Sequence, residues 1–315
     1  MSKEISPELS GVFAALTTPF DANGRPFLPA LDAIVEFGLD RGLKGLCLCG
    51  ATGEYAAWSV EQRLNLFRHV ADRVKGRAQL ICAVGAEHAG QVKQLAQAAV
   101  DCGAIALLFP PPGFLPYAQE DLVDFVAQVA ADLPLPVLIY NIPQCTRDLG
   151  LENILRLIAT VPNIIGLKDS SGHKPNLARI QAAQAQGPMV FMIGSDDLLL
   201  DAFEIGAVGS ISGIAGACPE LILSVYQAMH AGDKAAARAL QDRLNEFIRH
   251  ISELPATWAV KLAQQVQGLD VGTLAWPMGP KFQQKAQAFQ HWLRLQMDAT
   301  GHLALGQLKA PARSA

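Results

Sequence analysis

Short apolar runs alternate along this chain with longer segments of mixed polarity, from Gly11 to about His230. The runs are rich in β-branched residues, are mostly continuous, and end in Gly, Pro, Ser or Asp. Continuous apolar runs are typical of strands that are buried on both faces, as in a parallel sheet. We predict strands within residues 11–20, 45–50, 78–85, 104–111, 136–143, 164–171, 189–196 and 208–216.

The segments between the runs carry apolar residues at three- and four-residue spacing, which predicts amphipathic helices. The expected helices are Pro29–Arg41, Val60–Lys75, Gln91–Asp101, Glu120–Ala131, Glu152–Ala159, Pro175–Ala185, Asp197–Ile205 and Pro219–His230. Eight strand–helix units in about 220 residues predict a (β/α)8 TIM barrel of the α/β class. A doubly wound sheet is the alternative, but it favours a GxGxxG turn after the first strand, where this chain has TTPFDANG.

The alternation of strand and helix stops after Met229. Three later segments have helical spacing with no strand between them, namely Asp233–Ile251, Ala256–Gln267 and Lys281–Asp298. We therefore expect a barrel over residues 1–230 and a C-terminal helical extension of three helices over residues 231–315. The final stretch, KAPARSA, is small and polar, and we expect it to fray.

Composition narrows the class of protein. The chain has 315 residues, of which 50% are hydrophobic and 17% charged, so it can bury a large core. A net charge of −4 gives no basic surface for nucleic acid. No apolar run reaches the roughly 18 residues of a membrane span, and the first residues lack a signal-peptide layout. We expect a cytoplasmic protein.

The six cysteines form no CxxC motif. Cys47 and Cys49 are expected on one face of a strand, and we expect both to be buried.

In a TIM barrel the active site lies at the carboxyl ends of the strands. The predicted strands end in a lysine, a tyrosine, several hydroxyl groups and glycine-rich turns. These residues are Thr17, Thr18, Gly50–Glu54, the turn PPPGF, Tyr140, Asn141, Lys168–Ser170, Gly194–Asp197, Ser210, Ser212 and Gly213. We expect them to face one cavity.

Lys168 follows the apolar part of the stretch IIGLKDSSG and is the first candidate for chemistry. Burial disfavours the ammonium form of a lysine, and the neutral amine can attack a carbonyl group. Tyr140 ends the neighbouring strand and is placed to move protons to and from the resulting alcohol and imine. The alternative is a structural lysine that pairs with Asp169 or extends to solvent.

Two turns are candidates for substrate binding. In GATGE, small residues and Thr52 can present backbone N–H groups to a carboxylate, whereas the alternative is a plain turn that Thr52 caps. Glu54 is expected to hold this loop. In GSDD, the acidic side chains suit substrate hydroxyl groups rather than phosphate. The alternative for Asp197 is a negative charge that favours a helix N-terminus.

Metal chemistry has little support in the sequence. The seven histidines form no HxH, HxxH or HExxH pairing, and His173 stands alone near the predicted site. We expect no metal and no other cofactor. A magnesium ion held by Asp169 and Asp196 is the alternative.

Four motifs in this order, TTPF, GATGE, YNIP and GLKDSSG, resemble those of the dihydrodipicolinate synthase and N-acetylneuraminate lyase superfamily. The similarity runs from about Gly11 to Ile222. The resemblance implies that Lys168 forms a Schiff base with pyruvate or another 2-oxo acid. It also implies that Tyr140 transfers protons and that Thr52 holds the carboxylate of the 2-oxo acid. Members of this superfamily are usually metal-independent homotetramers.

Three positions depart from the pattern of the synthases. Ala51 stands where those enzymes carry a threonine of the proton relay, and Phe114 aligns with the relay's second tyrosine. Cys145 stands where an arginine grips the carboxylate of the second substrate, and an arginine is the best partner for such a group. Tyr117 and Arg147 lie nearby in sequence as replacements whose reach the sequence leaves open.

The sequence resembles the lyase and 2-keto-3-deoxy sugar-acid aldolase branches more closely. By this resemblance Ser170 touches the substrate chain, and Asp196 with Asp197 binds hydroxyl groups. The expected catalytic residues are Lys168 and Tyr140. The expected substrate-binding residues are Thr18, Ala51, Thr52, Phe114, Cys145, Ser170, Gly194, Asp196 and Ser212.

We therefore predict a Schiff-base (class I) lyase that cleaves or condenses a 2-oxo-3-deoxy acid, with pyruvate and an aldehyde as its small-molecule partners. Three alternatives stay open. They are a dehydratase of a 2-keto-3-deoxy sugar acid, a dihydrodipicolinate synthase with an altered relay, and a 2-oxo acid binder without catalysis.

Overall fold

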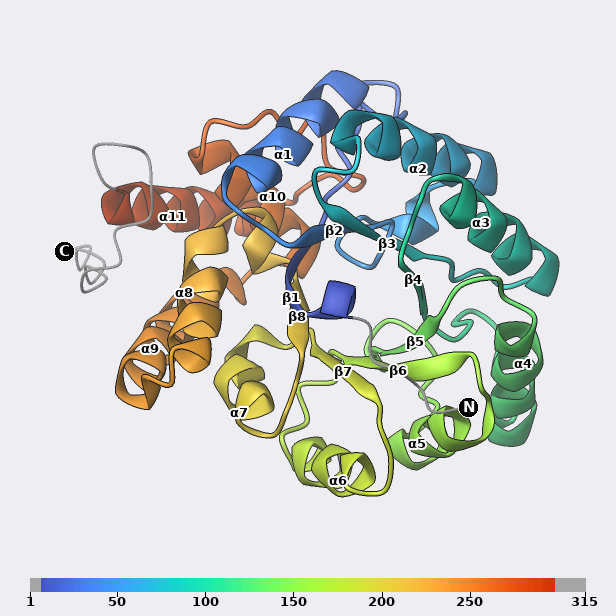
Figure 1. The fold of residues 1–315 in the computed structure, drawn as a ribbon. Helices are drawn as coiled ribbons and strands as arrows, with labels where there is room; N and C mark the ends of the chain where they lie inside the picture. Colours follow the sequence, from blue (N-terminus) through green and yellow to red (C-terminus); the bar gives the residue numbers. More distant parts are fainter. Residues whose placement is uncertain (1–6, 298–315) are drawn as a thin grey trace.

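The computed structural model describes residues 7–297, and its centre is a closed barrel of eight parallel strands (Figure 1). Each strand pairs with the next in sequence, and the last pairs with the first. The strands are β1 (Gly11–Ala15), β2 (Gly45–Leu48), β3 (Gln79–Ala83), β4 (Ala106–Phe109), β5 (Val137–Asn141), β6 (Ile164–Asp169), β7 (Val190–Ile193) and β8 (Gly209–Ser212). The predicted TIM barrel is confirmed, and the strands are buried on both faces as their continuous apolar runs indicated.

A helix follows each strand and packs around the barrel (Figure 1). The helices are α1 (Leu28–Asp40), α2 (Val60–Val74), α3 (Ala89–Asp101), α4 (Gln119–Ala131), α5 (Leu151–Thr160), α6 (Pro175–Gln184), α7 (Leu199–Glu204) and α8 (Pro219–His230). The segment predicted as one helix over Asp197–Ile205 is divided into a 3-10 turn, η3 (Asp196–Leu198), and α7. Helix α2 begins where the sequence supplies a capping box, in which Ser59 and Gln62 satisfy each other's backbone N–H groups.

The hydrophobic core has two layers. One fills the barrel with inward side chains such as Phe13, Leu138 and Met192, and the other lies between the strands and the surrounding helices. A short 3-10 turn, η1 (Pro7–Leu9), adds Leu9 to the interior layer just before β1. The N-terminal end of the barrel is thereby closed with apolar side chains, and the carboxyl end is left for polar groups.

Cys47 and Cys49 are both buried, as expected, but they do not share a face. Cys47 belongs to the interior of the barrel, whereas Cys49 belongs to the layer under the helices. The reason is the backbone of Cys49, which has a φ of 52° and therefore breaks the strand alternation directly after β2. The loop that carries GATGE thus begins with a strained residue.

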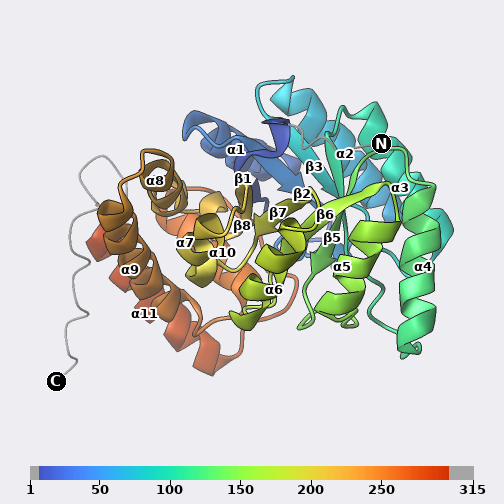
Figure 2. The ribbon, with the colours of Figure 1, turned by 60° about the horizontal axis from the view of Figure 1, so that its bottom comes forward.

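Within the described residues three helices follow α8, in agreement with the sequence pattern. They are α9 (Lys234–Ile251), α10 (Ala256–Val266) and α11 (Pro280–Gln296). Figures 1 and 2 show α9 beside α8 at one side of the barrel, and Figure 2 shows α11 next to α9. The division at residue 230 stays a prediction, and Asp298 and the KAPARSA stretch lie outside the described residues. No helix within residues 7–297 is long and apolar enough to cross a membrane.

Candidate active site

A cavity of about 560 Å³ lies at the carboxyl ends of the strands. This volume is typical of a site for a small organic substrate. The cavity brings together most of the predicted site residues, from the ends of β2, β5, β6 and β7. They are Ala51, Thr52, Tyr140, Cys145, Lys168, Ser170, Gly194 and Asp196.

Lys168 and Tyr140 are neighbours because β5 and β6 pair in parallel with these two residues in register. Register partners in a parallel pair point to the same face, which here is the inside of the barrel. The ammonium nitrogen of Lys168 lies 4.1 Å from the centre of the Tyr140 ring, and each residue is only 4% exposed. The sequence alternative of a Lys168–Asp169 ion pair is not found among the described residues. The Asp169 carboxylate instead accepts hydrogen bonds from the Asn141 amide and from Ser171.

Gly194 leaves the space that Lys168 and Ser170 occupy. A methyl group at Gly194 would lie 2.5 Å from Cε of Lys168 and 2.0 Å from Oγ of Ser170. The backbone of Ser170 is fixed on both sides, because its N–H donates to the carbonyl of Asn141 and its own carbonyl accepts from the Gln144 amide. The glycine of GSDD is therefore a steric requirement for the position of the amine.

The GATGE loop places Thr52 in the cavity and turns sharply at Glu54, whose φ is 54°. Glu54 points away from the cavity and accepts a hydrogen bond at 2.5 Å from the ammonium group of Lys261 on α10. The Lys261 side chain is fully buried, and burial lowers its pKa. Glu54 thus holds the loop in place, which is the structural role that the sequence analysis expected for it.

Asp196 is the acidic group nearest the chemistry. One carboxylate oxygen, Oδ2, accepts a hydrogen bond at 2.9 Å from the hydroxyl of Ser212, which in turn accepts from the N–H of Ala215. The other oxygen, Oδ1, is buried without a hydrogen-bond partner in the described residues. Burial raises the pKa of Asp196 to about 7, although the Ser212 hydrogen bond and the charge of Lys168 oppose this shift. Asp196 can therefore exchange a proton near neutral pH.

Three predicted site residues do not line the cavity. Thr18 is buried, and Ser212 lies behind Asp196, so that its hydroxyl is used in the bond just described. Phe114 is 81% exposed on the loop after β4. Arg147 does not line the cavity either, because its Nε donates to a backbone carbonyl of that same loop, at Leu115.

Sequence reasoning missed the wall that the C-terminal helices add to the cavity. This wall consists of Ile248, Ile251, Ser252, Leu254, Ala256, Thr257 and Val260. Gln144 and three isoleucines at or shortly after strand ends, Ile142, Ile211 and Ile214, also line the cavity, and the sequence did not predict them as site residues. The apolar members followed ordinary helical or strand spacing, so nothing in their pattern separated a cavity wall from a core.

Three polar side chains of the C-terminal helices hold the loops of the site. The Gln241 amide on α9 donates to the backbone carbonyl of Asp196. On α10, Lys261 holds Glu54, and Gln264 accepts from the hydroxyl of Thr17. All three C-terminal side chains are at most 3% exposed, so these bonds are shielded from water.

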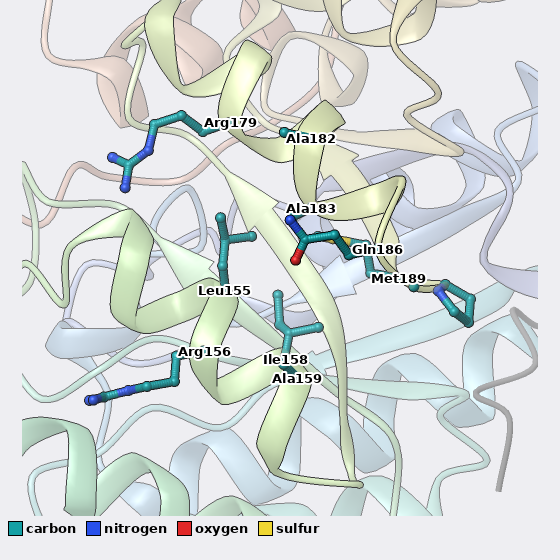
Figure 3. A pocket seen from close by; sticks show the side chains of 11 residues that line it. Leu155, Arg156, Ile158, Ala159, Arg179, Ala182, Ala183, Gln186 and Met189 are labelled. Carbon is teal, nitrogen blue, oxygen red and sulfur yellow. The ribbon is translucent and has the colours of Figure 1, made fainter.

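A larger cavity, of about 770 Å³, lies outside the barrel between α5 and α6. Figure 3 shows Leu155, Ile158 and Gln186 in this groove, with Arg156 and Arg179 extending at its edge. Residues just before β7 complete it, so it lies at the end of the barrel away from the catalytic candidates. No group of three or more metal-ligating side chains occurs in the described part of the chain.

Comparisons with known proteins agree with this architecture. The model of the Dihydrodipicolinate synthetase family matches residues 8–296. A 4-hydroxy-tetrahydrodipicolinate synthase of Pseudomonas aeruginosa is 31% identical over 256 residues, which cover 80% of this chain and 87% of that protein. An uncharacterized DapA-like lyase of Halobacterium salinarum is 31% identical over 271 residues, which cover 86% of this chain and 88% of that protein.

Solved structures give the same result. A dihydrodipicolinate synthase from Aquifex aeolicus has a TM-score of 0.80 at 26% identity, covering 89% of this chain and 96% of that chain. A sialic acid aldolase of Ruminococcus gnavus has a TM-score of 0.82 at 24% identity, covering 92% of this chain and 97% of that chain. At that identity the second likeness establishes the fold alone.

Proposed function

The chain belongs to the dihydrodipicolinate synthetase family, and from that premise we propose that it is a pyruvate-dependent class I aldolase. The enzyme cleaves a 2-oxo-3-deoxy acid into pyruvate and an aldehyde, or condenses these two. The observation that carries the proposal is the buried amine of Lys168 beside Tyr140, in a cavity that Thr52 also lines. Lys168 forms no ion pair within the described residues, and a buried lysine amine of this kind is suited to nucleophilic attack on a carbonyl carbon.

The proposed mechanism begins when the Lys168 amine attacks C2 of the 2-oxo acid and water leaves to give an iminium ion. The bond between C3 and C4 then breaks. Its electron pair moves into the enamine. Tyr140, which has given its phenol proton to the hydroxyl that left as water in the first step, takes the C4 hydroxyl proton as the aldehyde forms. Protonation of the enamine at C3 and attack by water at C2 release pyruvate and return the free amine.

Cys145 favours the aldolase over dihydrodipicolinate synthesis. It lines the cavity where the synthases carry an arginine, and Arg147 is bonded to the loop after β4 instead. The synthase is nevertheless the second candidate, because relatives with that name are 29% to 34% identical to this chain. Metal independence, a homotetramer and a cytoplasmic location are further parts of the proposal, since these are usual in the family.

The test is reduction with borohydride in the presence of pyruvate. We expect a covalent adduct on Lys168 by peptide mass spectrometry, and no adduct in Lys168→Ala. Tyr140→Phe serves as the matched control, because it keeps the amine and the ring. We expect it to form the adduct while losing roughly 10²- to 10⁴-fold in turnover, the usual contribution of a general acid–base group.

Substrate assays separate the alternatives. Pyruvate release from 2-keto-3-deoxy acids, followed with lactate dehydrogenase, supports the aldolase. Loss of water without pyruvate release supports the sugar-acid dehydratase. Consumption of aspartate semialdehyde with pyruvate supports the synthase. An adduct with no turnover of any substrate leaves the non-catalytic binder, and the absence of an adduct rejects every Schiff-base function.

A further inference from the structure

The cavity is polar at the strand ends and aliphatic on the side of the C-terminal helices. Thr52, Ser170 and Asp196 lie at the strand ends with Lys168. Ile248, Ile251, Leu254 and Val260 form the wall of the C-terminal helices, and Ile142, Ile211 and Ile214 extend it along the barrel. Ser252 and Thr257 are the polar members of this wall, whose other members are apolar. Most of the polar groups are therefore concentrated around the carbonyl chemistry, and the wall of the C-terminal helices is mainly hydrocarbon.

The aliphatic wall is held in place by its surroundings. Ile251, Leu254 and Val260 are between 4% and 8% exposed, and Ile248 packs against the same core. The wall also reaches the GATGE loop, because a methyl group at Gly213 would meet the side chains of both Thr52 and Val260. An aldehyde in the cavity must pack against this surface over much of its length.

The charges in the cavity oppose an acidic aldehyde. Among the described residues that line it, Lys168 is the only cation, and Asp196 and Asp197 are both acidic. Lys168 is consumed by the imine, so a second carboxylate has no cationic partner and faces two acidic side chains. A chain of several hydroxyl groups is also a poor match for the aliphatic part of the wall, because hydroxyls against the isoleucines lose their bonds to water without replacement.

We propose that the aldehyde partner carries a hydrocarbon body, aliphatic or aromatic, that packs against Ile248, Ile251, Leu254 and Val260. This inference rests on the proposed aldolase function and specifies its substrate. The reacting acid is then a 4-hydroxy-2-oxo acid with an apolar group on C4. Its cleavage breaks the C3–C4 bond, releases the apolar aldehyde and leaves pyruvate, with no other reactant than the water that hydrolyses the imine.

The experiment compares three aldehydes in condensation with pyruvate: hexanal, glyceraldehyde and succinate semialdehyde. Product is quantified by liquid chromatography and mass spectrometry. We expect kcat/KM for hexanal to exceed that for each of the other two by at least about tenfold, because one methylene in an apolar pocket contributes about tenfold or more. Ile248→Ser is expected to lower kcat/KM for hexanal by about tenfold, while Ile248→Val stays within about threefold of the parent enzyme.

Borohydride trapping with pyruvate accompanies every assay, and it also shows that each variant is folded. No adduct in the parent enzyme rejects the aldolase function, and the inference falls with it. An adduct accompanied by a preference for glyceraldehyde or succinate semialdehyde overturns the inference alone. So does an adduct with no turnover of any of the three, or an Ile248→Ser variant that uses hexanal as the parent does.

Discussion

Replacing Asp196 with asparagine should make the stability of the protein much less dependent on pH. The folded protein raises the pKa of this carboxyl from 3.8 to about 7, chiefly by burial. The folded state therefore keeps a proton on Asp196 over a pH range in which the unfolded chain has lost it. Since the folded state binds more protons there, the free energy of unfolding falls as pH rises from about 4, and the fall is complete above about 7.

The size of this effect follows from the pKa difference. A difference of about 3 corresponds to about 4 kcal/mol, at about 1.36 kcal/mol for each pKa unit. About 3 kcal/mol of this loss falls between about pH 5 and about pH 8.5. The amide that replaces the carboxyl cannot ionise. The Asp196→Asn variant should therefore resemble the parent protein near pH 5 and exceed its stability by about 3 kcal/mol at about pH 8.5.

The assay is urea unfolding followed by circular dichroism at both pH values and one protein concentration. Asp197→Asn is the matched control, because Asp197 is the exposed neighbour in the same turn. Its charge is only a minor cause of the raised pKa of Asp196, so this variant should keep most of the pH dependence of the parent. The reasoning is refuted if the parent and Asp196→Asn lose the same free energy of unfolding between the two pH values.

Two further predictions concern the supports of the site. Gly194→Ala should fold but lose most of the borohydride adduct, because its methyl group takes the place of Cε of Lys168. Gly187→Ala is the control, since nothing lies within 4 Å of the new methyl group, and it should form the pyruvate adduct as the parent does. Lys261→Met should lower the free energy of unfolding in urea by about 3–5 kcal/mol, because it leaves Glu54 buried without its partner. Adding Glu54→Gln should restore most of the loss, and a single variant as stable as the parent would contradict the role of this pair.

The sequence predicted the barrel because each strand and helix is encoded locally. Continuous apolar runs, helical spacing and turn residues all lie within a few positions of one another, so their pattern can be read directly. The proximity of Lys168 and Tyr140 also followed, because consecutive parallel strands present their carboxyl ends at the same edge. The strand register that brings the Lys168 nitrogen to 4.1 Å from the centre of the Tyr140 ring could not be predicted from the sequence, since it depends on packing.

The C-terminal wall could not be predicted because its residues play two roles at once. Ile251 and Val260 fit the apolar face of their helices whether or not a cavity lies beyond them. The Glu54–Lys261 ion pair could not be predicted either, because 207 positions separate its members. The placement of Cys49 was predicted wrongly, since the left-handed backbone after β2 has no marker such as glycine.

The hydrogen bonds from the C-terminal helices to the loops of the barrel also bear on the stage of folding at which the candidate active site forms. Gln264 joins Thr17 across 247 positions, and Lys261 joins Glu54 across 207. Contacts this distant in sequence form late, after the local strand–helix units. During synthesis, we therefore expect the loops that carry Thr52 and Thr17 to reach their final positions only after the C-terminal helices have left the ribosome. In the folded protein, partial unfolding of α10 should likewise abolish activity at the site while the barrel remains folded.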